Sequence, residues 1–243
     1  MFSVRERDAI QQRLLDLADA DPVVVGAAIT GSNATNCADE WSDVDLAFAV
    51  AGPLDVTMHR WTERLYQDFG AVHHWDLPSG ATTYRVFLLP GCLEVDIAFT
   101  PEADFGPLGP SWHTVFGHAA NPQAVPPPSR DHLAGMAWHH ALHAWVSIQR
   151  CRWWQAEYWI SALRGHILAL ASLRLGHPTN YAKGAHLLPT DVTAPLEAAL
   201  VRTLTPTELH RAWAAATDAL TAELARSDLA LADRLRSVLA DLD

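Results

Sequence analysis

The sequence predicts an α/β (α+β) fold in which an N-terminal mixed sheet with flanking helices precedes a C-terminal helical bundle. Segments near residues 43–50 and 93–99 alternate polar and apolar side chains with the period of a strand. Between residues 100 and 130 the composition shifts to Pro, Gly and Ala. Beyond that stretch, apolar residues recur at helical spacing. We therefore expect one domain over 1–125 and a second over 126–243.

Helices and strands alternate in the first 70 residues. Ser3 and Glu6 have the spacing of a capping box, which predicts a helix that ends before Asp21-Pro22. The apolar run over 23–29, bounded by turn residues, predicts a buried strand. A strand over 43–50 and a helix over 53–69 are expected next, with Gly70 closing the helix.

The next segments complete the predicted sheet. A strand is expected over 72–77, and the runs 82–89 and 93–99, joined through Pro90-Gly91, predict a hairpin. Together with the earlier elements they give a mixed sheet with helices on one face.

The second half predicts helices. Ser129 is the expected N-cap of a helix that runs to about residue 150, and a second helix is expected over 153–175. Thr205-Pro206 has an N-cap followed by proline at the first helical position, and a last helix is expected from about Ser227.

Charge and cysteine content limit the class of protein. The formal net charge is −11, from 17 Lys+Arg and 28 Asp+Glu, which argues against a nucleic-acid partner and favours attraction of a cationic small molecule. The three cysteines lack CxxC spacing, which predicts a reduced, cytoplasmic chain without disulfides. No apolar stretch approaches 18 residues, so no membrane partner is expected. We expect a monomer or a homodimer.

Three acidic residues are candidates for a common site. Asp43 and Asp45 project from one strand face, about 7 Å apart. Asp96 lies on a later strand, with Glu94 on the same face. If the strands pair, the carboxylates approach one another, and two such charges about 4 Å apart cost roughly 4 kcal/mol at an effective dielectric near 20. Such a group needs a proton or a divalent cation.

The spacing of these residues resembles a known family. Gly31-Ser32, ten intervening residues, the run Asp43-Val44-Asp45-Leu46 and a third Asp on a later strand resemble the nucleotidyltransferases of the DNA polymerase beta superfamily. The loop is most similar to the aminoglycoside and lincosamide nucleotidyltransferases and to the minimal nucleotidyltransferases of toxin–antitoxin pairs. At positions 35–36, where that branch often carries Arg-Gly, this chain has Thr35-Asn36, and Asn36 is expected to accept the left-handed conformation.

The resemblance implies roles for these residues. Gly31 and Ser32 would hold the β- and γ-phosphates of an NTP, and Asp43 and Asp45 would bind two Mg²⁺ ions. Asp96 would complete the shell of the second ion or accept the proton of the attacking hydroxyl. The expected reaction transfers an NMP to a hydroxyl of a small acceptor and releases pyrophosphate. Residues 1–125 would form the catalytic domain and residues 126–243 a substrate-binding bundle.

The second half offers further candidates. Lys183, the only lysine in the chain, lies where related antibiotic nucleotidyltransferases place a triphosphate-contacting lysine, although an ordinary surface lysine is the alternative. Arg164 would contact the same phosphates or form a surface salt bridge. Glu157 and Tyr158 are expected to face the substrate. Glu157 would bind an amine or replace Asp96 as the base.

Other side chains have structural alternatives. Tryptophans crowd the first two bundle helices and would line an acceptor pocket or pack the core; they are Trp138, Trp145, Trp153, Trp154 and Trp159. His139 and His143 have the i, i+4 spacing of a zinc helix but lack its glutamate.

The first hypothesis for the acceptor is an aminoglycoside-like or lincosamide-like antibiotic. The alternatives are a toxin–antitoxin-type enzyme that modifies protein or RNA, and a non-catalytic nucleotide-binding protein.

Overall fold

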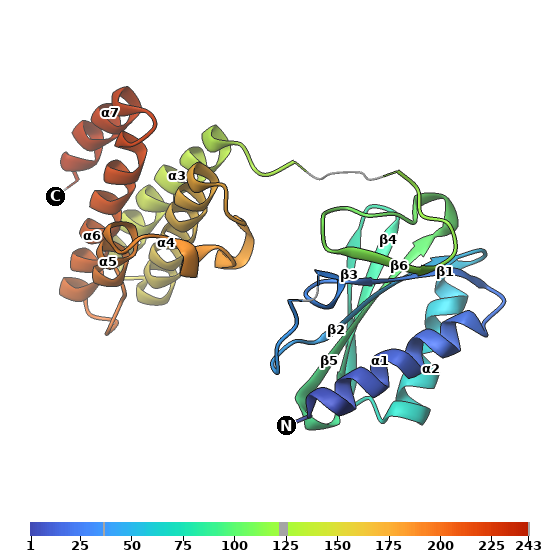
Figure 1. The fold of residues 1–243 in the computed structure, drawn as a ribbon. Helices are drawn as coiled ribbons and strands as arrows, with labels where there is room; N and C mark the ends of the chain where they lie inside the picture. Colours follow the sequence, from blue (N-terminus) through green and yellow to red (C-terminus); the bar gives the residue numbers. More distant parts are fainter. Residues whose placement is uncertain (36, 122–125, 243) are drawn as a thin grey trace. The chain divides into compact units, whose positions relative to one another are not determined.

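The structure, a computed structural model, describes residues 1–35, 37–121 and 126–242. Asn36, whose conformation was predicted above, lies outside these ranges. The chain divides into two compact units, Met1–Val125 and Pro126–Asp243. The predicted fold class is confirmed, because the first unit holds a mixed sheet flanked by helices and the second consists of helices and connecting turns (Figure 1).

The sheet of the first unit has six strands in the order β3-β4-β5-β2-β1-β6. Only β2 and β5 pair in parallel among the described strands, and the other neighbours are antiparallel. The two parallel strands are separated in sequence by the helix α2 (Leu54–Phe69) and the β3–β4 hairpin, so their pairing is a long-range contact. The strands are β1 (Val24–Thr30), β2 (Val44–Val50), β3 (His73–Ser79), β4 (Thr82–Leu89), β5 (Leu93–Pro101) and β6 (Trp112–Phe116).

The edge strand β6 was not predicted. It lies inside the Pro- and Gly-rich stretch that we expected to separate the domains, and it is five residues long. A strand this short gives little periodic signal, and its pairing with β1 supplies backbone hydrogen bonds that the sequence pattern does not reveal.

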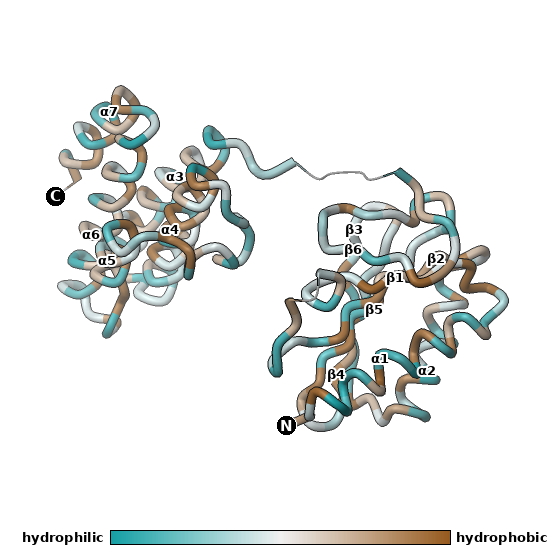
Figure 2. The backbone as a smooth tube through the Cα atoms, in the orientation of Figure 1, coloured by the Kyte–Doolittle hydropathy of each residue, from teal (hydrophilic) through white to brown (hydrophobic). Residues whose placement is uncertain are grey.

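Two helices cover one face of the sheet, as predicted: α1 (Val4–Asp19) and α2 (Leu54–Phe69). The capping box of Ser3 and Glu6 is present, and Gly70 closes α2 in the left-handed conformation. Brown and teal residues alternate along both helices in Figure 2, as expected for amphipathic helices. Large side chains fill the interface, including Phe48 against Trp61 with ring centroids 4.8 Å apart.

A buried carboxylate fixes the turn between α1 and β1. Asp21 accepts hydrogen bonds from Arg60 (2.6 Å) and from the indole N–H of Trp61 (3.0 Å), both on α2. Its Oδ1 also accepts the backbone N–H of Val23. The charge is therefore paired and hydrogen-bonded where it is buried, which is the condition for a buried carboxylate to be tolerated. This contact sets the point at which β1 enters the sheet.

The second unit contains five α-helices in its described residues. They are α3 (Arg130–Gln149), α4 (Trp153–Leu175), α5 (Thr190–Ala198), α6 (Pro206–Ala225) and α7 (Leu229–Ala240). Buried alanines, such as Ala137 and Ala141 on α3 and Ala156 on α4, let the helices pack closely. The short helix α5 was not predicted, since Pro195 lies inside it and no side chain caps its start.

The tryptophans of the second unit divide between core and surface. Trp145, Trp153 and Trp159 are partly buried against the bundle core, as the packing alternative expects. Trp138 and Trp154 are exposed, the latter with 78% of its surface accessible. In the ranges that the structure describes, no helix is both long and apolar enough to cross a membrane.

Candidate active site

The strand pairing brings two of the predicted carboxylates together. Because β5 runs parallel to β2 in register, Asp45 lies directly beside Asp96. Neighbouring strands are about 4.8 Å apart, so the two side chains start from adjacent positions on one sheet face. Asp43, the residue before β2, is close enough for its charge to act on Asp96. The opposite face, with Val44 and Leu46, is buried against the helices.

Asp96 lies in an environment that disfavours its charged form. Burial raises the pKa of Asp96 to about 7, and the negative charges of Glu94 and Asp43 contribute in the same direction. Within the described part of the chain, its Oδ1 is buried and has no hydrogen-bond partner. A buried carboxylate oxygen without a partner is costly, and it gains most from a proton or a cation.

Gly31 follows β1 and lies against Asp45. Its φ of +62° is in the left-handed region, which glycine adopts without strain. A Cβ at this position would lie 2.7 Å from Asp45 Cγ and would overlap Asp45 Oδ2. The absence of a side chain is therefore what lets the turn approach the carboxylate.

The loop between Gly31 and β2 is fixed by its own hydrogen bonds. Asn33 Nδ2 donates to the carbonyl of Asp43 at 3.0 Å, and the carbonyl of Ser32 accepts the N–H of Cys37 at 3.0 Å. The far end is held from helix α1, where buried Arg7 donates to the carbonyl of Asp39 at 2.6 Å. The loop that carries the motif is thus braced at both ends.

Three residues of this site were missed by sequence reasoning. Asn33 and Arg7 act through backbone carbonyls of the loop, and no sequence pattern marks such contacts. Tyr84 lies on β4, beside β5, where burial and the negative charge of Asp96 raise the pKa of its hydroxyl. Strand alternation was the available signal for Tyr84, since it shares the face of Thr82 and Val86.

Lys183 belongs to the helical unit, in the turn after α4, and is exposed. The two residues before it, Tyr181 and Ala182, both have positive φ values (53° and 56°), which is a strained conformation for residues with a side chain. Gly184, the next residue, packs so closely that a Cβ would lie 2.6 Å from the carbonyl oxygen of Pro178. The lysine therefore projects from a tightly constrained turn.

Arg164 contacts the bundle itself. Its guanidinium donates to the carbonyl of Ala199 (3.0 Å) and to Ser161 Oγ (3.2 Å). Burial lowers the pKa of Arg164, and the nearby charge of Glu157 partly opposes this. Glu157 is half-buried, whereas Tyr158 is exposed.

The histidines of α3 form an aromatic cluster with α4. His139 and His143 have ring centroids 4.2 Å apart, and the buried ring of His140 contacts Trp159 and His166. Burial lowers the pKa of His140 to about 4, and the neighbouring histidines add to the effect. In the described residues, neither His140 Nδ1 nor Trp159 Nε1 has a hydrogen-bond partner.

The described ranges contain no group of three His, Cys, Asp or Glu side chains arranged to hold a metal ion. The donor chemistry nevertheless fits Mg²⁺, since Asp43, Asp45 and Asp96 supply only oxygen ligands and one of those oxygens is buried without a partner.

No family model matches the sequence, and no curated protein matches it. Among solved structures, an aminoglycoside 6-adenyltransferase from Bacillus subtilis aligns with 94% of this chain and 95% of its own, at 11% sequence identity and a TM-score of 0.37. A TM-score this low does not establish a shared fold, so the chemistry of the site rests on its own residues.

Proposed function

We propose that this protein is a nucleotidyltransferase that transfers an NMP from an NTP to a hydroxyl of a small acceptor and releases pyrophosphate. The observation that carries the proposal is the juxtaposition of Asp45 and Asp96 on parallel neighbouring strands, with Gly31 against Asp45. The buried Oδ1 of Asp96, which has no hydrogen-bond partner among the described residues, would gain most from a cation or a proton.

In this proposal Asp43, Asp45 and Asp96 would hold two Mg²⁺ ions. When bound, Mg²⁺ would neutralise negative charge on the triphosphate and make the acceptor hydroxyl more acidic. The turn at Gly31 and Ser32 would orient the β- and γ-phosphates; its backbone lies against Asp45 because Gly31 has no side chain.

The transfer step is a displacement at the α-phosphorus. A bond forms from the acceptor oxygen to the α-phosphorus while the bond from that phosphorus to the bridging oxygen breaks, and pyrophosphate leaves with the electron pair. Asp96 either completes the shell of the second ion or accepts the hydroxyl proton. Glu157 is the alternative base. Orientation and charge neutralisation supply most of the rate enhancement.

The helical unit would supply the remaining contacts. Lys183, exposed on its constrained turn, would pair with the triphosphate. Arg164 is the weaker candidate for that role, because it already donates to Ala199 and Ser161. Glu157 and exposed Tyr158 would contact the acceptor. We propose an aminoglycoside-like or lincosamide-like acceptor, which the net charge of −11 would attract if it is cationic.

The direct test incubates the protein with Mg²⁺, NTPs labelled at the α-phosphate and a panel of aminoglycosides and lincosamides. Transfer of label to an antibiotic, with stoichiometric pyrophosphate, supports the proposal. Label in protein or RNA favours the toxin-type alternative, and NTP binding without turnover favours the non-catalytic one.

Asp43→Asn is the matched variant for this assay. We expect Mg²⁺ to raise the unfolding temperature of the wild-type protein. Asp43→Asn should abolish both turnover and this effect of Mg²⁺. The variant should stay folded, because Asp43 precedes its strand and is not part of the core. Asp68→Asn, at an exposed position on α2, is the control and should leave both unchanged. Full turnover in Asp43→Asn would refute the role of the carboxylates.

A further inference from the structure

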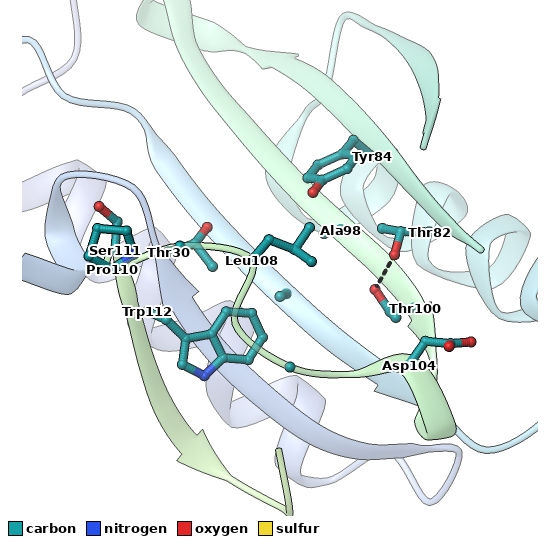
Figure 3. Close-up of a pocket in the computed structure, with 13 residues that line it drawn as sticks. Thr30, Thr82, Tyr84, Ala98, Thr100, Asp104, Leu108, Pro110, Ser111 and Trp112 are labelled. Carbon is teal, nitrogen blue, oxygen red and sulfur yellow. Dashed lines mark hydrogen bonds between the residues drawn. The ribbon is translucent and has the colours of Figure 1, made fainter. Parts of the chain in front are cut away.

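A cavity of about 270 Å³ lies on the carboxylate face of the sheet, within the N-terminal unit. Its floor is made by small residues, Ala47 on β2 and Ala98 on β5. Its roof is the loop before β6, and Figure 3 shows Leu108 of that loop between Tyr84 and Trp112. Binding sites for drug-sized ligands are typically about 300–1,000 Å³, so this cavity has room for about one substituted ring.

The cavity lies on the same sheet face as Asp45 and Asp96, although neither carboxylate is among its lining residues. Ala47 and Ala98 are each two residues beyond Asp45 and Asp96 on the same strand faces, which is about 7 Å along the sheet. Tyr84 connects the two regions, because it lines the cavity and lies within the electrostatic influence of Asp96. A ligand in the cavity would therefore extend past Tyr84 to bring a hydroxyl to Asp96, the residue that would accept the hydroxyl proton.

The lining presents hydroxyl groups on a mostly apolar surface. Its hydroxyl-bearing side chains are Thr30, Thr82, Tyr84, Thr100 and Ser111. Thr82 and Thr100 hydrogen-bond to each other at 3.0 Å, and the indole N–H of Trp112 donates to Thr114, so these groups are held in place. Hydroxyls and apolar carbon suit the alternating polar and apolar groups of a saturated, hydroxylated ring.

The side chains that line the cavity suit an amine better than a triphosphate or a nucleobase. Among the described residues that line the cavity there is no Lys, Arg or His, so no cationic side chain is present to neutralise a triphosphate. It also lacks Asn and Gln, which pair with the edges of nucleobases. The one charged side chain is Asp104, at the end away from the catalytic carboxylates, and it can pair with an amine.

We infer that this cavity binds a single hydroxylated ring of the acceptor, a sugar or cyclitol that carries at most one or two amines, with the reacting hydroxyl toward Asp96. The inference rests on the proposed function and adds the place and chemistry of the acceptor ring. The nucleoside of the NTP lies outside this cavity, and so does the rest of a larger acceptor, because the volume is that of one ring.

Binding can be measured without turnover. Protein labelled with ¹³C in its alanine methyl groups is titrated with 2-deoxystreptamine, methyl glucoside or adenosine at about 10 mM, since fragments of this size bind weakly. Variants at Ala47 and Ala98 assign the two floor methyl signals. We expect the aminocyclitol or the glucoside to shift both signals and adenosine to leave them unchanged.

The second measurement uses the transfer assay. Ala98→Leu fills the cavity from its floor and should raise KM for the acceptor at least tenfold, with KM for the NTP within a factor of two of wild type. Ala81→Leu, on the exposed hairpin turn between β3 and β4, is the control and should change neither constant. Circular dichroism checks that both variants fold, and the titration of the unmodified protein does not depend on them.

The outcomes separate the inference from the proposed function. Shifts with adenosine that exceed those with the two ring compounds would assign the cavity to the nucleoside and overturn the inference. An absence of shifts with all three probes would overturn it as well. Shifts with the aminocyclitol or glucoside, together with no transfer of label to any acceptor, would support the ring site and refute the transferase.

Discussion

The geometry of the site requires a glycine at position 31 for two reasons. Its left-handed φ and its contact with Asp45 are two separate requirements, and a side chain conflicts with both. Gly80, in the β3–β4 turn, has nearly the same φ (+61°), but nothing lies within 4 Å of a Cβ built there. Adding a methyl group at Gly80 would therefore cause backbone strain alone, whereas adding one at Gly31 would also displace the carboxylate of Asp45.

Gly31→Ala is expected to lower turnover at least tenfold, because the new methyl group must push Asp45 out of position. The backbone strain alone should cost about 1 kcal/mol of unfolding free energy in either variant. Gly80→Ala should therefore show a similar loss of stability with unchanged turnover. Equal turnover in the two variants would contradict the role of Gly31. Thermal unfolding and the labelled-NTP assay measure the two effects.

The raised pKa of Asp96 predicts that the metal-free protein becomes less stable as pH rises. Its pKa of about 7 in the folded state exceeds the ordinary value of 3.8, so the folded protein binds more protons than the unfolded chain between these values. Ionisation of Asp96 therefore lowers the free energy of unfolding progressively as pH rises from about 4 to about 7. Above pH 7 this destabilisation no longer increases.

Asp96→Asn removes this cost and should stabilise the metal-free protein. We expect a gain of up to about 4 kcal/mol in unfolding free energy at pH 8 and roughly 40% of that at pH 5. Urea unfolding in the presence of EDTA at both pH values measures the difference. A variant that is less stable than wild type at pH 8 would show that Asp96 is not a strained carboxylate. Turnover should be lost in the same variant.

At the scale of elements, helix α1 does more than cover the sheet. Its buried Arg7 donates to the carbonyls of Asp39 and Ser42 and so holds the loop that leads into β2. Arg5 lies on the same helix with the same charge but is exposed. Substituting Arg7 and Arg5 separately therefore distinguishes the hydrogen bonds to the loop from the general effect of a positive charge on α1.

Arg7→Met should destabilise the protein by about 1–3 kcal/mol, because it removes the hydrogen bonds that the buried guanidinium donates to two loop carbonyls. It should also raise KM for the NTP several-fold, since the loop positions Asp43. Arg5→Met should leave both quantities within error of wild type. Chemical denaturation and steady-state kinetics provide the measurements. An unchanged KM in Arg7→Met would show that the loop keeps its position without α1.

The elements also show what the sequence reveals and what it does not. Strand alternation correctly placed Val44 and Leu46 in the core, and the capping box at Ser3 marked the start of α1. The parallel register of Asp45 and Asp96 depends on contacts between strands that are far apart in sequence, which no local pattern encodes. The cavity was not predicted for the same reason, because five strands and a loop contribute its lining.

At the scale of the whole molecule, the two units have separate hydrophobic cores. Leu46 and its neighbours form the main core of the first unit, and Leu163 belongs to the core of the second; the two clusters share no described residue. Chains with independent cores commonly depart from two-state unfolding. We therefore expect calorimetry to resolve two thermal transitions.

Leu46→Ala and Leu163→Ala assign the transitions. Both leucines are almost fully buried, and each substitution should cost about 2–5 kcal/mol in its own unit only. One transition should therefore move in each variant while the other stays in place. A single transition that moves in both variants would show that the units unfold together.

The solitary lysine has a practical consequence. Apart from the amino terminus, Lys183 carries the only primary amine of the polypeptide, and it is exposed. An amine-selective dye would therefore attach to a single side chain without any cysteine engineering. Slower modification of that amine in the presence of an NTP would report directly on whether a triphosphate approaches that turn of the helical unit.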